Sequence, residues 1–409
     1  MLKEEQVLLL NILKESLQGK SYDLTFPGND SFLRLMKLAQ EQQLLPSICE
    51  AIYQSECLRN SRVFTSFKNK AIQQAAMHKI RTEEFLNIYR KLQKEGITPL
   101  VVKGIVCQSL YPNTLLRIAV DDDLFVPDHS FTACHHFLLD YGLNADTPVT
   151  NINSVDEISY HQEESPIYIE LHRTLFPKTS SAYGHFNKLF KQASARSVWV
   201  QTENSNIKTL CPTDHLLYLI LHAFKHFLHS GIGIRPLCDI ALFAERYNQE
   251  IDWNHIKTSL ISINAFDYAR ALFCIIDLYL MPDASYSKSI AEWDIRSIDS
   301  EALLQDILES GIHGASSMSR LHSSTITLNA VTNRKKDTSI MHSIFLPMKS
   351  MKSKYPYLNK FPLLLPFAWI QRSFHYIQEL RHSTSNDVID SIQIGKNRIK
   401  LLRQYNVIN

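Results

Sequence analysis

The sequence has no CxxC pair, no apolar run long enough to span a membrane and no strong excess of charge of one sign. Its seven cysteines are scattered over 409 residues, which predicts reduced thiols rather than a disulfide framework or a zinc site. The formal net charge is +2, so no field of the whole chain favours nucleic acid or an anionic membrane. The longest apolar stretches, "FPLLLPFAWI" and "ALFCIIDLYLM", fall short of the roughly 20 residues that a bilayer requires.

The first twenty residues are amphipathic and carry acidic side chains throughout, whereas a signal peptide has an unbroken apolar centre. We therefore expect a cytoplasmic protein with no membrane partner. A hydrophobic content of 45% with 21% charged residues is ordinary for a globular protein and excludes a disordered chain.

The hydrophobic periodicity divides the chain into three regions. Apolar residues recur every three or four positions up to "TEEFLNIYRKLQKEG", where Gly96 ends the helical pattern. The pattern becomes helical again from "TDHLLYLILHAFKHFLHSG" onward. We predict a helical region over 1–94, an α/β core over 95–205 and a helical region over 206–409, with a polar loop near 312–340.

The central region mixes short strands and helices. "ITPLVVKG" is a buried strand that enters a turn, and "IVCQSLYP" is a short helix that ends before its proline. "EISYHQ" and "IYIELHRTLF" alternate polar and apolar residues, as half-buried strands do. The expected fold class is α+β, with a small mixed sheet between two helical regions.

Three consecutive aspartates lie in "RIAVDDDLFV", which otherwise has the pattern of a buried strand. Because side chains alternate along a strand, Asp121 and Asp123 share one face. Asp122 points with the aliphatic side chains, and we expect it near a strand edge or paired with a cation. The opposite face, expected to be buried, consists of Ile118, Val120, Leu124 and Val126.

Two carboxylates about 7 Å apart on one strand face can chelate Mg²⁺, which prefers oxygen ligands. Glu170 is the best third carboxylate, since a neighbouring strand could bring it alongside the aspartates. Lys103 and Gly104 lie at the start of a helix, where backbone N–H groups can receive a phosphate. His172 follows Glu170 on the same strand face, and carboxylates around it would raise its pKa and make it an acid–base candidate.

A second candidate site lies in "HAFKHFLH", where His222, His226 and His229 are spaced along one helix face. The glutamate of an HExxH zinc motif is missing, and Asp239 would have to supply a further ligand. In the alternative interpretation, these histidines line a substrate cleft or form a buried polar network with Arg235 and Asp239.

Three stretches together resemble the uncharacterised nucleotidyltransferase family of the polymerase-beta superfamily. They are "LVVKGIVCQSLYPNTLLRIAVDDDLFV", "IYIELHR" and "DHLLYLILHAFKH". They match a lysine–glycine turn, a short helix ending in tyrosine–proline, an arginine four residues before a D-x-D strand, and a later acidic residue followed by x-His. The likeness extends more loosely to the helical leader and to "FLPMKSMKSKYPYLNKFPLLLPFAWIQRS".

The resemblance implies that Asp121, Asp123 and Glu170 hold metal. Lys103 and Gly104 occupy the place of the phosphate-binding turn of the superfamily. The family arginine is matched by Arg117, which would either neutralise phosphate or pair with the aspartates. Histidines on the helix of His222 and His226 also belong to the family pattern, which favours a place for both in the nucleotide cleft.

The chain departs from the family pattern at two positions. Val120 stands where the pattern has glycine, and Asp122 stands where it has an apolar residue. The first departure could change how closely a phosphate approaches, and the second could change which carboxylates bind metal.

The implied activity is Mg²⁺-dependent transfer of a nucleoside monophosphate from an NTP, with two metal ions. The acceptor would be a protein hydroxyl, an RNA end, a sugar phosphate or a small metabolite. One alternative is a catalytically inactive nucleotide-binding or interaction protein with a degenerate core. Another is a metal-dependent phosphohydrolase or kinase-like transferase that uses the same acidic cluster or the helix histidines, with metal near His222 and His226 instead of the aspartates.

Overall fold

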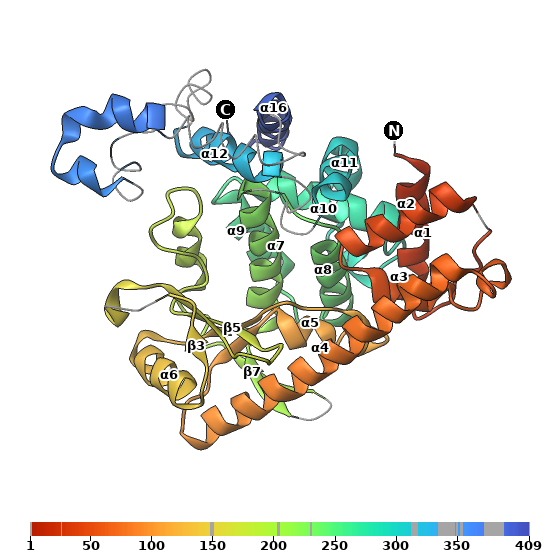
Figure 1. The fold of residues 1–409 in the computed structure, drawn as a ribbon, viewed down its shortest axis with the longest axis horizontal. Helices are drawn as coiled ribbons and strands as arrows, with labels where there is room; N and C mark the ends of the chain where they lie inside the picture. The colour runs from red at the N-terminus through yellow and green to blue at the C-terminus, as the bar shows by residue number, and fades with distance from the viewer. Residues whose placement is uncertain are drawn as a thin grey trace.

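The computed structural model describes residues 2–25, 27–147, 151–202, 205–229, 231–311, 318–333, 348, 351, 355–371 and 388–408. It is 61% helical and 8% strand, and the strands form a small mixed sheet beside helices from both ends of the chain (Figure 1). The expected fold class, α+β, is confirmed.

The central sheet has five strands in the order β1-β2-β5-β4-β3. The neighbours β2 and β5 are parallel, and every other pair in this sheet is antiparallel. In the parallel register Asp123 lies opposite Glu170. The strands are β1 (Leu100–Val102), β2 (Asp122–Phe125), β3 (Asn144–Ala145), β4 (Glu157–His161) and β5 (Tyr168–His172).

The aspartate strand is shorter than the sequence pattern suggests. It begins only at Asp122, so Asp121 lies before it, and Val120 is 57% exposed rather than buried. The prediction for Val120 is wrong because three arginines hold the preceding segment away from the sheet. Arg81 donates to the carbonyl of Ala119, Arg235 donates to the carbonyl of Ile118, and Arg117 turns to Asp239.

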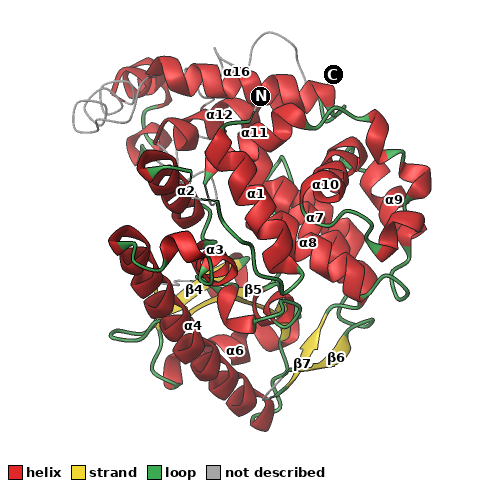
Figure 2. Cartoon of the chain, turned by 90° about the vertical axis from the view of Figure 1, so that its right-hand side faces the viewer, coloured by secondary structure: helices red, strands yellow, loops and turns green. Residues whose placement is uncertain are grey.

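In Figure 2 the sheet lies near the N-terminal helix α4 (Arg62–Lys94), whereas the C-terminal helices α12 (Met318–Asn333) and α16 (Val388–Gln404) lie at the top, away from it. The long helix α4 ends just before Gly96, as the sequence predicts. One continuous cluster of buried side chains, from Leu9 to Ile408, joins the N-terminal helices, the sheet and the C-terminal helices. The three predicted regions therefore share a core, and their boundaries at 94 and 205 stay a prediction.

The remaining helices and strands lie on either side of this core. A second sheet, the hairpin of β6 (Val198–Gln201) and β7 (Asn206–Thr209), was not expected from the sequence. The α-helices are α1 (Glu4–Leu17), α2 (Asn29–Glu41), α3 (Leu45–Ile52), α5 (Gly104–Gln108), α6 (Asp128–Asp140), α7 (Pro212–His229), α8 (Arg235–Arg246), α9 (Trp253–Ile261), α10 (Phe266–Tyr279), α11 (Glu301–Ser310), α12 (Met318–Asn333) and α16 (Val388–Gln404).

Short 3-10 helices connect many of these elements. They are η1 (Glu56–Leu58), η2 (Thr114–Leu116), η3 (Ile152–Ser154), η4 (Gly184–Phe190), η5 (Ser285–Lys288), η6 (Ala291–Trp293), η7 (Ile295–Ser297), η9 (Pro356–Asn359) and η10 (Pro362–Leu364).

Helix α12 occupies much of the segment near 312–340, so the polar loop expected there is wrong for 318–333. The helix forms because it packs on α7 and α16, with Thr327 donating to the carbonyl of His229 at the end of α7. The rest of the expected loop, 312–317 and 334–340, lies outside the described residues.

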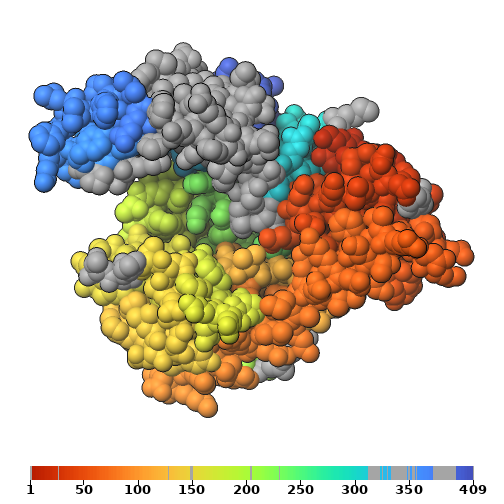
Figure 3. All heavy atoms as spheres, in the orientation of Figure 1, coloured from red at the N-terminus to blue at the C-terminus, as the bar shows by residue number. Residues whose placement is uncertain are grey.

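All seven cysteines are free thiols, as their scatter predicts. Of the helices that the structure describes, none is long and apolar enough to cross a membrane. Figure 3 shows the red and orange surface of the N-terminal helices beside the yellow surface of the sheet region.

Candidate active site

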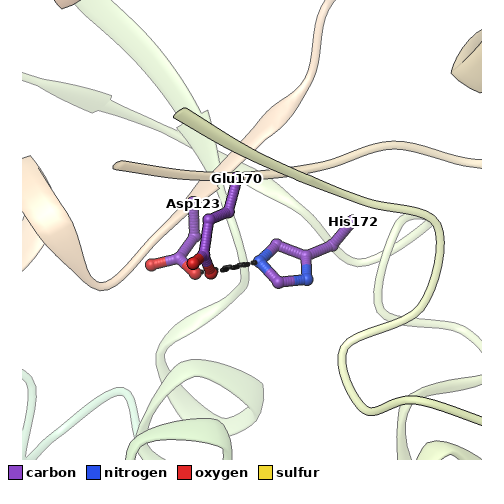
Figure 4. A group of neighbouring side chains, drawn as sticks. All are labelled: Asp123, Glu170 and His172. Atoms are coloured by element: carbon purple, nitrogen blue, oxygen red, sulfur yellow. Dashed lines mark hydrogen bonds and ion pairs between the residues drawn. The ribbon is translucent and has the colours of Figure 1, made fainter. Parts of the chain in front are cut away.

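An acidic group forms where β2 and β5 run side by side. Asp123, Glu170 and His172 each offer a ligand atom, and these atoms lie within 4.8 Å of one another (Figure 4). The parallel register brings Asp123 beside Glu170, and the two-residue period of β5 places His172 on the same face as Glu170. Two carboxylates from adjacent strands suit a divalent cation such as Mg²⁺, and His172 lies beside both of them.

Two cationic groups neutralise Asp123. The Lys103 Nζ atom lies 2.8 Å from Oδ2, and the His172 Nε2 atom lies 2.9 Å from Oδ1. Burial alone would raise the pKa of Asp123, but the positive charge of Lys103 and the hydrogen bond from His172 lower it far below its usual range. Asp123 is therefore ionised in the folded protein.

His172 lies among three carboxylates. Besides Asp123, its Nδ1 atom is 3.3 Å from Glu157 Oε2 and its Nε2 atom is 3.4 Å from Glu170 Oε2. Burial disfavours the imidazolium, but hydrogen bonds to the three carboxylates outweigh burial and raise the pKa of His172 well above its usual value. The His172 side chain is thus in its protonated, positively charged form at neutral pH. Sequence reasoning missed Glu157, although its position opposite His172 follows from the pairing of β4 with β5.

The other two aspartates have different surroundings. Asp122 is buried and its Oδ2 atom lies 2.6 Å from Arg81, so the expected pairing with a cation is confirmed. Burial raises the pKa of Asp122 to about 6, although Arg81 opposes the shift. Asp121 is half-buried and is not one of the three clustered ligand residues, but it lines the same pocket as Asp123. Nothing local in the sequence points to Arg81, which reaches the site from α4.

The Lys103–Gly104 turn closes one side of this pocket. Lys103 has a φ of 55°, and its backbone N–H donates to His215 Nε2 at 3.1 Å. Its ammonium also lies 3.0 Å from His222 Nε2, so the turn is connected to α7. The following helix, α5, is only five residues long, so the positive charge at this place comes mainly from Lys103.

Gly104 is required by the geometry of the turn. Its φ is +34°, and an added Cβ would come within 3.1 Å of Asp122 Oδ1. We expect Gly104→Ala to lower the free energy of unfolding by about 1–2 kcal/mol and to weaken nucleotide binding, because Asp122 is next to Asp123. Urea unfolding and titration calorimetry measure the two effects.

Gly96 provides the matched control. It also has a positive φ, +76°, but no atom lies within 4 Å of an added Cβ. Gly96→Ala should carry a similar conformational cost and leave nucleotide binding unchanged. Equal nucleotide affinity in the two variants would show that the turn at Gly104 does not shape the pocket.

Two arginines, Arg117 and Arg235, line the same pocket as Asp121 and Asp123. Arg117 forms a bidentate ion pair with Asp239, donating at 3.0 Å through Nε and at 2.7 Å through Nη2. Of the two roles expected for Arg117, pairing with the aspartates of the strand is therefore wrong, because its partner is on α8. Tyr111 donates to the same carboxylate at 2.8 Å, and burial with nearby Arg117 lowers the pKa of Arg235.

Helix α7 contributes one histidine to the lining of this pocket. His222 lines the pocket, and its Nε2 atom is 3.3 Å from that of His226. His229 is exposed. Within the described part of the chain, the clustered ligand atoms belong to Asp123, Glu170 and His172 and not to α7. The geometry therefore favours metal at the sheet over metal at the helix histidines.

The lysine–glycine turn and the carboxylates on adjacent strands agree with the arrangement expected of a nucleotidyltransferase. The model of a family described as "uncharacterised nucleotidyltransferase" matches residues 29–280, more than half of the chain, and the protein belongs to this family. No curated protein and no solved structure matches the chain.

Proposed function

We propose that the protein transfers a nucleoside monophosphate from an NTP to a hydroxyl or phosphate acceptor, with Mg²⁺ as the cofactor. The parallel register that places Asp123 beside Glu170 carries this proposal, because it gathers ligand atoms within 4.8 Å of one another. Oxygen ligands at this spacing fit Mg²⁺. When bound, the metal would lower the pKa of the attacking group and neutralise the leaving pyrophosphate.

The residues that line the pocket, and Glu170 beside Asp123, have separable roles in this proposal. Asp123 and Glu170 would hold the cation, and Asp121 adds a carboxylate to the pocket wall. Lys103 and Arg235 present positive charge toward the same space, where the phosphates of the NTP would be bound. The pocket has a volume of about 40 Å³, so the nucleoside would extend outside it.

The reaction is an in-line displacement at the α-phosphorus. A bond forms between the acceptor oxygen and the α-phosphorus, and the bond from the α-phosphorus to the oxygen that bridges to the β-phosphorus breaks, so that pyrophosphate leaves. A hydroxyl acceptor also loses its proton. Because His172 keeps a proton among three carboxylates, Glu170 is better placed than His172 to accept it.

The two departures from the family pattern leave this arrangement intact. Asp122 points to Arg81 and away from the clustered ligands, so it does not compete with Asp123 for metal. Val120 is exposed and lies outside the strand. These placements argue against the alternative of an inactive core.

The test is a calorimetric titration with each of the four NTPs, with and without Mg²⁺, on the wild type and on the Asp121→Ala/Asp123→Ala variant. We expect binding that requires Mg²⁺ and that the variant loses. Binding that ignores both the metal and the variant would overturn the proposal and favour an interaction protein.

A further inference from the structure

A second and much larger pocket, the α4 groove, lies between α3, α4 and η2. It is lined mainly by apolar side chains and has a volume of about 580 Å³, within the usual range for small-molecule sites. Both ribbon views place α3 alongside α4 (Figures 1 and 2). The phosphate chemistry proposed above does not use this pocket.

The groove exists because α4 presents small side chains at this place. Ala71 and Ala75 are one helical turn apart, and together with Ala76 they line the groove with Leu115 and Leu116. Large apolar side chains stand at its edges: Ile72 is 56% exposed and Tyr53 is 49% exposed. Exposed apolar side chains around a concave space are typical of a ligand-binding groove.

The charged side chains of the groove favour an anionic ligand. Lys68 and Lys79 line it, about 16 Å apart along the helix at 1.5 Å per residue. Lys68 has no acidic partner among the described residues, and Lys79 has only a long contact of 3.9 Å with Glu83. The acidic residue of the groove, Glu50, accepts hydrogen bonds from Asn113. The excess charge is therefore positive.

Two segments of the chain run from the α4 groove to the candidate active site. Leu116 lines the groove, and the next residue, Arg117, lines the catalytic pocket. On α4, Lys79 lines the groove and Arg81 pairs with Asp122 beside Asp123. A transfer reaction requires both substrates at once, and the catalytic pocket of about 40 Å³ has no room for a second molecule.

We propose that the α4 groove binds the acceptor, and that the acceptor is an apolar small molecule carrying an anionic group. The apolar part lies against Ala75 and Leu116, and Lys68 binds the anionic group. This inference rests on the proposed nucleotidyl transfer, but the occupation of the groove can be tested without it.

The probe is anilinonaphthalene sulfonate, an apolar anion whose fluorescence rises on binding, titrated into the full-length protein. Ala75→Trp fills the groove and should weaken probe binding at least about tenfold. Lys68→Glu should weaken it about threefold to fivefold. Gln73→Trp, which adds the same bulk to an exposed position of α4 outside the groove, is the control and should bind like the wild type. Decanoate should displace the probe, and decyltrimethylammonium should not.

A second titration separates the groove from the nucleotide site. Addition of Mg²⁺ and NTP should leave the probe bound, since acceptor and nucleotide occupy different pockets. Displacement of the probe by NTP, equal binding in Ala75→Trp and Gln73→Trp, or displacement by the cationic amphiphile would each overturn the inference. Failure of NTP to bind at all, with the probe results as expected, would instead contradict the proposed function.

Discussion

Glu170→Gln is expected to lower nucleotidyl transfer by about 10²–10⁴-fold, the range for loss of a group that moves a proton or stabilises the transition state. The reason is that Glu170 is one of the three clustered ligand residues, while its side chain is 24% exposed. Its loss should therefore leave the fold unchanged. Pyrophosphate release from NTP measures the rate, and paramagnetic resonance of added Mn²⁺ measures metal affinity.

Glu157 provides a closely matched control. It also contacts His172, from the neighbouring strand, and its side chain is 33% exposed, but it is not one of the clustered ligand residues. Glu157→Gln removes the same charge and should cost only about 10–100-fold, as for a group that orients a metal ligand. A larger loss in Glu157→Gln than in Glu170→Gln would mean that the metal is bound elsewhere.

Asp239→Ala is expected to have the largest effect on stability, a loss of about 3–5 kcal/mol in the free energy of unfolding. The carboxylate is buried between two cationic side chains, Arg117 and Arg235, and both are themselves buried. Its removal leaves the buried Arg117 guanidinium without its ion-pair partner, close to the like charge of Arg235. Urea unfolding measures the change.

Exposed ion pairs give the comparison. Glu83→Ala breaks the pair with Lys79, in which both side chains are more than half exposed, and should cost no more than about 0.5 kcal/mol in the free energy of unfolding.

The pH dependence of stability provides a second check on the role of Asp239. The folded-state pKa of Asp239 is lowered, through Arg117, despite burial, so its stabilisation is present above about pH 4 and is lost as the pH falls below that value. Similar losses in Asp239→Ala and Glu83→Ala would contradict a stabilising role for the buried pair.

The strands that carry Glu170 and His172 could be predicted from the sequence because their side chains alternate with a period of two. The true start of the aspartate strand could not, since it depends on contacts with distant helices: Arg81 and Arg235 donate to this segment, and Arg117 within it turns to Asp239. Local patterns contain no information about those partners. The same reason explains why Arg81 was missed and why Asp239, not an aspartate of the strand, receives Arg117.

The sequence analysis did not predict two further elements, and the reasons differ. The β6–β7 hairpin has a local signal, because β-branched and aromatic residues at 198–200, 207 and 209 flank a short polar stretch of the sequence. Helix α12 has none, because it is rich in serine and threonine and buries polar side chains such as Ser323 and Thr327. Only its packing on α7 and α16 accounts for it. The predicted metal role of Asp121 stays a prediction, whereas the proximity of Asp123 to Glu170 follows from the parallel register.

The parallel pairing of β2 and β5 also has a consequence for how the protein folds. Parallel neighbours cannot be joined by a tight turn, and the chain between them forms α6, β3 and β4 before it returns to the sheet. Contacts of such large sequence separation require closure of a long loop and form slowly. We therefore expect the metal-binding group to be among the last parts of the sheet to assemble, so that metal affinity during refolding would report completion of the core.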